Sequence, residues 1–207
     1  PYKAYKFFKG WISKFLKPHT FKLFRVNLND LICLIWLKTH IKMTSKHPSE
    51  SLTVLTDLVL PSETNPLNNL FGGELLARMD RAASIAAGRH SRRIAVTASV
   101  NHVAFNKAIP LGSVVIIEAK VSRAFNTSME IYLDVWVEDR QSGNRTKANE
   151  AIYTFVAVDE MGRPVEVPQI IPETELEKKR FDAALRRKQL SLLLAGKMKP
   201  QEATELK

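Results

Sequence analysis

The 207-residue sequence contains a single cysteine, Cys33, so no disulfide can form within the chain. Nothing therefore points to an oxidising compartment, and we expect a cytoplasmic protein. The absence of cysteine after residue 33 excludes a catalytic thiol from the rest of the chain. The five histidines do not cluster at the spacing of zinc ligands, so we also expect no metal site.

Long apolar runs are missing as well. The longest, LICLIWL at residues 31–37, is far shorter than the roughly twenty residues that a bilayer-spanning helix needs. The order of basic region, apolar stretch and small-residue cleavage site that marks a secretory signal is also absent. We expect no stable insertion into a membrane.

Acidic residues are scarce only in residues 1–42, which hold nine Lys/Arg and one acid, Asp30. Residues 43–207 carry 22 basic and 20 acidic side chains, so the net charge of +10 belongs mainly to the N-terminal segment. Binding to nucleic acid requires a dense basic surface that neutralises phosphates. The nearly even balance over residues 43–207 argues against nucleic acid as a partner of this part.

Three interpretations of the basic, aromatic extension at residues 1–42 stay open. In the first, Met43 is the true start and the extension is not part of the native protein. In the second, the extension is an organelle transit peptide, which its few acids favour and its excess of lysine over arginine disfavours. In the third, it is a membrane-surface anchor, as its mixture of basic and aromatic residues suggests.

The remaining chain indicates one domain with a single long helix among several strands. A polar linker at 43–50 precedes a domain over 51–171, and a charged helix and tail fill 172–207. β-Branched and alternating patterns predict strands at 51–60, 94–105, 114–125, 127–139 and 146–160. In the strand at 94–105, Ile94, Val96, Ala98 and Val100 should form a half-buried face. Since no alternating β-α units occur, we expect an α+β fold in which a curved antiparallel sheet wraps the helix.

The segment at 61–90, PSETNPLNNLFGGELLARMDRAASIAAGRH, contains this helix. A helical wheel places an apolar arc on one side, formed by Leu75, Leu76, Met79, Ala82, Ala83 and Ala86. It places Glu74, Arg78, Arg81 and Gly88 on the other. Asp80 lies at the margin, where small neighbours leave room for another molecule beside the carboxylate. A solvated Asp at the boundary is an equally good interpretation of the wheel alone.

Two glycines, Gly72 and Gly73, stand where the helix begins. The first N–H groups of a helix are unpaired, and glycine allows a ligand to approach them closely. Such a site can hold an oxyanion formed when a carbonyl is attacked. An ordinary N-terminal turn is the alternative interpretation of the two glycines. For Asn65, just upstream, the alternative is likewise an ordinary turn residue with no role in chemistry.

Several spaced segments together resemble one protein family. They are PSETNPLNNLFGGELLARMDRAASIAAGRHS, VTASVNHVAFNKAIPLGS, NTSMEIYLDVWVE and AIYTFVAVDEMGRPVEVP, which appear in this order within residues 51–168. This pattern resembles the hot-dog-fold acyl-coenzyme A thioesterases. Asn101 and Ser113 depart from it, because acids are common at these positions in the family; neither position is catalytic there.

The resemblance implies a hot-dog domain that forms edge-to-edge homodimers and, further, hexamers that are trimers of dimers. It implies an enzyme that hydrolyses fatty acyl-CoA to free fatty acid and coenzyme A without a cofactor. Asn65 of one subunit would face Asp80 of another, with Asp80 as general base or nucleophile and Asn65 positioning the thioester or water. The amides of Gly72 and Gly73 would stabilise the oxyanion. The alternative is a hot-dog protein that binds acyl-CoA or an acyl carrier without turning it over.

Coenzyme A carries phosphates, so basic side chains should meet it. The candidates are Arg92, Arg93, Arg163 and Arg180. For each of them an ordinary solvated charge is the alternative. The turn at Asn126, Thr127 and Ser128 resembles the family segment that lines the coenzyme groove.

Overall fold

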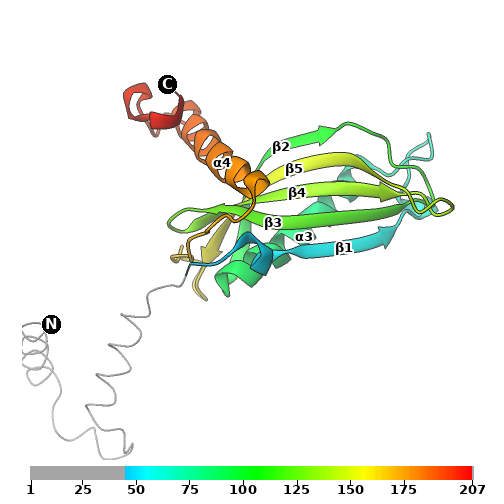
Figure 1. Cartoon of the computed structure of the whole chain (residues 1–207), viewed down its shortest axis with the longest axis horizontal. Coiled ribbons are helices and arrows are strands. Elements are labelled where there is room, and N and C mark those ends of the chain that lie inside the picture. The colour runs from blue at the N-terminus through cyan, green and yellow to red at the C-terminus, as the bar shows by residue number, and fades with distance from the viewer. Residues whose placement is uncertain (1–44, 207) are drawn as a thin grey trace, which may run out of the picture. The chain divides into compact units, whose positions relative to one another are not determined.

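A computed structural model describes residues 45–206, so the interpretations of residues 1–42 concern a segment outside the described range. The described chain forms a sheet of five strands and two long helices, with short 3-10 turns between and after them (Figure 1). In chain order these are β1 (Thr53–Leu58), α3 (Gly72–Ser91), β2 (Ile94–Phe105), β3 (Val114–Ala124), β4 (Ser128–Glu138), β5 (Arg145–Val158) and α4 (Glu175–Leu194).

The strands form one antiparallel sheet in the order β1-β3-β4-β5-β2. Strands β2, β3, β4 and β5 follow one another in the chain without an intervening helix. Strands β1 and β2, which α3 separates in the chain, form the two edges of the sheet. The predicted α+β architecture, with one long helix packed on an antiparallel sheet, is confirmed.

The core lies between α3 and one face of the sheet. Met79, Ala82, Ala83 and Ala86 of α3 are fully buried. They pack in one cluster with inward-facing β4 side chains such as Leu133. Because alanine has a short side chain, the helix axis can approach the sheet closely, and the predicted apolar arc is the buried side of the helix.

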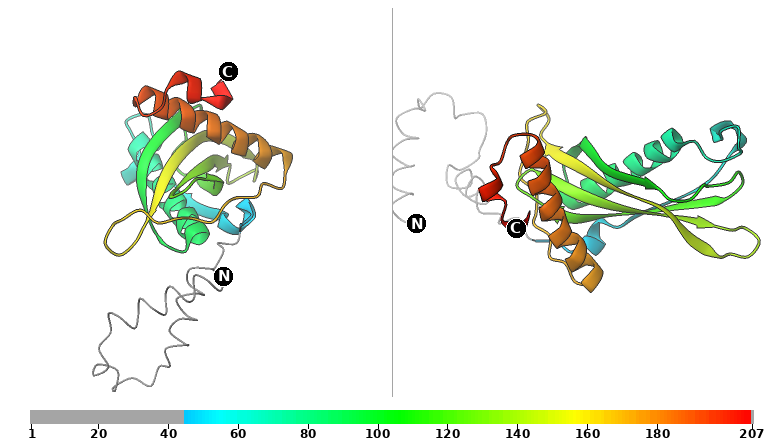
Figure 2. Two further views of the ribbon diagram at one scale, coloured as in Figure 1. Left: turned by 90° about the vertical axis from the view of Figure 1, so that its left-hand side faces the viewer. Right: turned by 90° about the horizontal axis from the view of Figure 1, so that it is seen from above.

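Helix α4 lies on the opposite face of the sheet, near one end (Figure 2). It begins at Thr174, whose hydroxyl accepts a hydrogen bond from the Glu177 amide, as a capping box does. It is followed by Gly196, which has the left-handed φ of +66° that commonly ends a helix, as predicted. Two arginines, Arg180 and Arg187, connect α4 to acids of β4.

Strand β2 differs from the prediction of a half-buried strand. Ile94, Val96 and Val100 are 60%, 47% and 46% exposed. The physical reason is topological: β2 is an edge strand that pairs only with β5, and α4 covers other strands. The alternating apolar pattern is real, but nothing within the described part of the chain covers it.

Arg78 also differs from its place on the helical wheel. The wheel put it on the side opposite the apolar arc, yet its side chain is only 4% exposed. The end of β1 and the turn after it cover this side of α3, where Arg78 pairs with Asp57 and Glu63.

No helix in the described range is long and apolar enough to cross a bilayer.

His90, near the end of α3, is completely buried. Its Nε2 lies 2.7 Å from the carbonyl oxygen of Pro168, whereas its Nδ1 has no hydrogen-bond partner among the described residues. Burial, together with the nearby Lys46 charge, lowers the pKa of His90 below its usual 6.5, despite the hydrogen bond to Pro168. The folded protein therefore favours the neutral imidazole.

We expect acidification to destabilise the fold through His90. The unfolded chain protonates this residue at a higher pH than the folded chain does, so the free energy of unfolding should fall as the pH drops below about 6.5. Urea unfolding at pH 7.5, 6.5 and 5.5 would measure this loss. All three pH values lie above the reference pKa values of Asp and Glu, about 4, so ordinary carboxylates stay ionised throughout. His90→Gln should flatten the dependence. Equal slopes for wild type and His90→Gln would contradict the assignment.

Candidate active site

Asp80 lies in the middle of α3, at the border between buried and exposed faces of the helix. Its Oδ1 accepts a hydrogen bond of 2.7 Å from the hydroxyl of Thr97 on β2. Thr97 is exposed, so the pair faces outward along the uncovered edge of the sheet. The carboxylate is thus oriented by a neighbour and open to a further molecule.

Tyr153 of β5 lies beneath this pair. Its hydroxyl donates to the Leu76 carbonyl oxygen over 3.3 Å. Burial, together with the negative charge of Asp80, raises the pKa of Tyr153 to about 12. A neutral, protonated phenol therefore stands beside the carboxylate at physiological pH.

Asn65 lies in the turn that precedes α3. Its Oδ1 accepts hydrogen bonds from the amides of Leu67 and Asn69, at 2.9 and 3.2 Å. Its own amide donates to the Asn69 carbonyl oxygen. The side-chain oxygen therefore shapes the turn, while the Nδ2 group makes no hydrogen bond to other described residues and can donate to a ligand.

Gly72 and Gly73 are the first two residues of α3. A Cβ built on Gly73 would meet no atom within 4 Å, whereas one on Gly72 would lie 3.4 Å from the ring of Phe105. The start of the helix is therefore open to a ligand beside Gly73. Phe71, the N-cap residue, offers no side-chain cap to the first amides.

The two glycines begin α3, whereas Asp80 lies in its middle. Asp80 comes seven positions after Gly73, which is about 10 Å along the helix axis at 1.5 Å per residue. One small carbonyl group cannot touch both places at once. Each chain thus presents the two parts of the predicted site separately.

Three of the four arginines predicted to hold coenzyme A lie at the other end of α3. Arg92, Arg93 and Arg163 line a common hollow of about 450 Å³, together with Asp159 and Glu160. Arg163 is already paired, since its Nη2 lies 2.8 Å from Asp159. The two other arginines follow the C-terminus of α3 and are exposed.

The turn at residues 126–128 is at this same end of the sheet. Ser128 opens β4 opposite Val156 of β5, two residues from where Val158 pairs with Ile94 of β2. The carbonyl oxygens of Asn126 and Thr127 accept hydrogen bonds from Val167 and Ala157. The turn is therefore held by its backbone, and the side chain of Asn126 is exposed.

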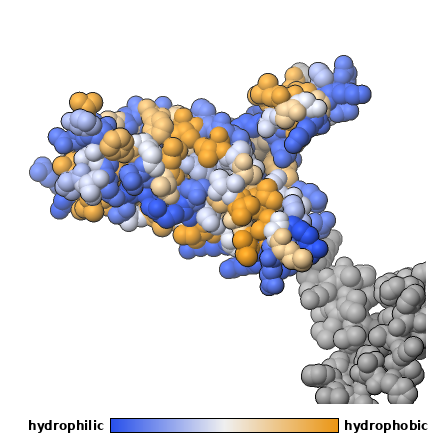
Figure 3. All heavy atoms as spheres, turned by 180° about the vertical axis from the view of Figure 1, so that it is seen from behind, coloured by the Kyte–Doolittle hydropathy of each residue, from blue (hydrophilic) through white to orange (hydrophobic). Residues whose placement is uncertain are grey.

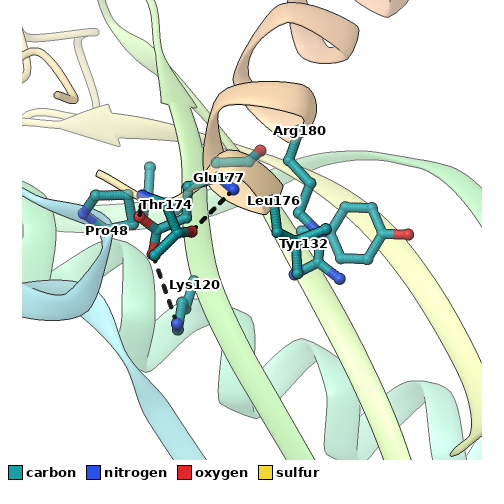
Figure 4. A pocket seen from close by; sticks show the side chains of 9 residues that line it. Pro48, Lys120, Tyr132, Thr174, Leu176, Glu177 and Arg180 are labelled. Carbon is teal, nitrogen blue, oxygen red and sulfur yellow. Dashed lines mark hydrogen bonds and ion pairs between the residues drawn. The ribbon is translucent and has the colours of Figure 1, made fainter. Parts of the chain in front are cut away.

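Arg180 lies apart from the other predicted arginines, on α4 (Figure 4). Its Nη2 donates to both carboxylate oxygens of Asp134, at 3.0 and 2.8 Å. Its guanidinium also stacks over the ring of Tyr132 at 3.7 Å. The structure brings Arg180 to this helix–sheet contact and not to the hollow formed by Arg92, Arg93 and Arg163.

Thr97 is the site residue that sequence reasoning missed. Its position in a strand was predicted, but nothing local in the sequence indicates that its hydroxyl reaches a carboxylate seventeen residues earlier. The contact depends on how β2 crosses α3, which is a long-range property of the fold.

The family model, the similar sequences and the similar structures all point to thioesterases. A family model described as the thioesterase superfamily matches residues 67–143. The chain is 43% identical over 138 residues to an uncharacterized acyl-CoA thioester hydrolase of Bacillus subtilis, covering 67% of this chain and 80% of that protein. An apo-hexameric acyl-CoA thioesterase superposes with a TM-score of 0.71 at 39% identity, covering 73% of this chain and 97% of the other.

An acyl-CoA hydrolase of Staphylococcus aureus, solved in complex with butyryl coenzyme A and coenzyme A, superposes with a TM-score of 0.70 at 34% identity. The alignment covers 73% of this chain and 92% of that one. Variants of that hydrolase with a single asparagine, aspartate or threonine replaced by alanine have also been solved. Along its chain these residues are separated by 15 and then 17 residues, the spacings of Asn65, Asp80 and Thr97 here.

Proposed function

The chain belongs to the acyl-CoA thioester hydrolases of the thioesterase superfamily, and we propose that it hydrolyses fatty acyl-CoA to a free fatty acid and coenzyme A. The observation that carries the proposed site is the hydrogen bond between Thr97 and Asp80. It orients a carboxylate on the open edge of the domain. The matching spacing of the residues replaced in the S. aureus hydrolase supports the same choice.

In the proposed reaction, Asp80 removes a proton from a water molecule that attacks the thioester carbonyl carbon. The C–S bond then breaks, the acyl group leaves as the acid, and the sulfur of coenzyme A takes up a proton. In the alternative, the Asp80 carboxylate attacks the carbonyl carbon itself and water hydrolyses the resulting anhydride. Neither route changes an oxidation state, so no redox cofactor is needed. Because Asp80 itself activates the water or attacks the carbonyl carbon, we propose that no metal takes part either.

The start of α3 would stabilise the charge that develops on the carbonyl oxygen. The amides of Gly72 and Gly73 point out of the helix N-terminus, and the open space beside Gly73 admits an oxygen. The Nδ2 group of Asn65, in the turn that precedes this helix, would position the thioester or the water. These groups meet Asp80 only if a second subunit supplies it, because about 10 Å separates the two parts in one chain.

The exposed edge strand β2 suits such an association. It presents unpaired backbone groups and the apolar side chains of Ile94, Val96 and Val100, which monomeric proteins normally cover. A two-fold pairing of β2 edges would place the Asp80–Thr97 pair of each subunit at the interface. We propose that these dimers assemble further into hexamers as trimers of dimers, as the hexameric state of one similar thioesterase suggests.

Coenzyme A would extend from this site toward the hollow at Arg92, Arg93 and Arg163. Arg92 and Arg93 are the stronger candidates for its phosphates, because Asp159 already balances Arg163. The turn at Asn126 is a further candidate for the coenzyme groove. Arg180, already paired with Asp134, is the weakest of the proposed contacts.

We expect three single variants to lose hydrolysis while keeping the fold. Asp80→Asn and Asn65→Ala should each lower kcat about 100-fold or more, because each removes a group that acts on the reacting atoms. Thr97→Val should lower kcat roughly 10-fold by releasing the carboxylate, and Thr97→Ser should retain activity. Release of free thiol from acyl-CoA measures the rates. Binding of acyl-CoA without thiol release by the wild type would instead favour the non-catalytic alternative.

Gly73→Ala should separate stability from activity. Alanine favours a helix over glycine, and the open space around Gly73 accepts a methyl group, so the unfolding free energy should rise by about 0.5 kcal/mol. The same methyl group would stand where the carbonyl oxygen approaches, and kcat should fall about 10-fold or more. A stabilised variant with undiminished kcat would contradict the proposed role of this helix end.

Mixing two inactive variants tests the shared site directly. When Asn65→Ala and Asp80→Asn chains are co-refolded, each mixed dimer contains one intact site and one site that lacks both groups. Random pairing makes about half of the dimers mixed, so activity should return to about a quarter of the wild-type value. Two differently tagged chains allow the mixed species to be isolated. No recovery in a purified mixed oligomer would show that each site is built from one chain.

A further inference from the structure

We propose that Arg78 is a positioning residue that holds the turn carrying Asn65 against α3, and thereby sets the geometry of the site. Its catalytic consequence rests on the function proposed above. Neither the helical wheel nor the comparisons assign a role to this residue.

Arg78 joins two elements that precede α3 in the chain. Its Nε donates to Asp57 Oδ2, at the end of β1, over 2.9 Å. Its Nη2 donates to Glu63 Oε1, in the 3-10 turn η3 (Pro61–Glu63), over 2.6 Å. The guanidinium is therefore a bridge of two short, charge-assisted hydrogen bonds, and burial of the Arg78 side chain shields it from solvent.

Glu63 passes this restraint on to the Asn65 turn. Its second carboxylate oxygen accepts a hydrogen bond of 3.0 Å from the Leu60 amide, and its carbonyl oxygen accepts one of 2.9 Å from the Phe71 amide. Phe71 is the N-cap residue of α3. Residues 60–71, which include Asn65, are thus tied at both ends to the residue that Arg78 holds.

The charge states agree with this geometry. The hydrogen bond from Arg78 lowers the pKa of Asp57, and the Leu60 amide together with Arg78 lowers the pKa of Glu63. Burial alone would lower the pKa of Arg78, but its bonds to the two acids outweigh this effect and raise it. All three groups therefore stay ionised and paired at neutral pH.

The position of Arg78 on α3 connects the bridge to the proposed site, because Asp80 lies on the same helix. Arg78 and Asp80 are two residues apart, about 200° around the helix, so they face nearly opposite sides. Asp80 faces β2 and the open edge, while Arg78 faces the turn of its own chain. In a two-fold dimer the bridge would fix Asn65 relative to α3 and, through the interface, relative to the Asp80 of the other subunit.

Lysine cannot replace this arginine. It keeps the charge, but a single ammonium group lacks the planar fork that contacts Asp57 and Glu63 at once. Arg78→Lys therefore releases the turn and keeps the helix charge. Glu63→Gln is a second variant, which preserves shape and removes only the charged acceptor. Arg81→Lys is the matched control. Arg78 and Arg81 both line a hollow beside β1, but Arg81 forms no ion pair among the described residues.

The first measurement is hydrogen exchange in the intact oligomer. Arg78→Lys and Glu63→Gln should speed exchange at the Leu67, Asn69 and Phe71 amides at least about 10-fold, while the middle of α3 stays protected. Arg81→Lys should leave both regions unchanged. Unchanged exchange in the turn of the two bridge variants would overturn the proposal.

The second measurement is a double-mutant cycle in kcat. Arg78→Lys should lower kcat about 10- to 100-fold with KM within about twofold, because misplacing a reacting group by about 1 Å has effects of this size. In an Asn65→Ala background the same change should have no further effect on kcat. An equal loss in both backgrounds would show a purely structural role and overturn the proposal.

The two measurements separate this inference from the proposed function. If Asn65→Ala alone retains full kcat, the catalytic assignment of Asn65 is wrong. The positioning role of Arg78 is then overturned as well, even if hydrogen exchange shows that the bridge holds the turn. If Asn65→Ala is inactive and the bridge variants loosen the turn without lowering kcat, the proposed function stands and only the positioning role is overturned.

Discussion

The close packing of α3 on the sheet is the constraint on which the rest of the structure depends. The buried side of the helix is rich in alanine, with Leu75 and Met79 near its start, so the helix axis can lie close to the sheet. A larger residue at Ala82, Ala83 or Ala86 would push the helix away. Because the proposed site is distributed along this one helix, its geometry follows from how the helix is seated.

The three proposed functional parts of α3 do not compete, because they occupy different parts of its surface. The N-terminus offers free amides at Gly72 and Gly73, the middle carries Asp80 toward the open edge, and the C-terminus leads into Arg92 and Arg93. The buried stripe stabilises the fold, and Arg78 fastens the remaining side. A rigid helix keeps these groups at constant spacing, as precise positioning in catalysis requires.

The uncovered edge at β2 fits the proposal that a second chain completes the site. Apolar side chains and unpaired backbone groups would be costly to leave in water, and Asp80 with Thr97 lies beside them. Separate patches of apolar residues also appear on the face shown in Figure 3. Association through β2 would cover this edge and at the same time bring groups from two chains together, so stability and activity would depend on the same contact.

The sequence by itself determined the α+β class, the central and C-terminal helices, the antiparallel strands and the buried arc of α3, because these follow from local periodicity and turn residues. Its motifs also indicated Asn65, Asp80 and the two glycines. Only the tertiary structure decided the burial of Arg78, the bond from Thr97 to Asp80, the exposure of β2 and the separation of Arg180 from the other arginines. Periodicity specifies which face of an element is apolar. Which distant element covers each face depends on strand order and helix placement, and these arise from long-range pairing.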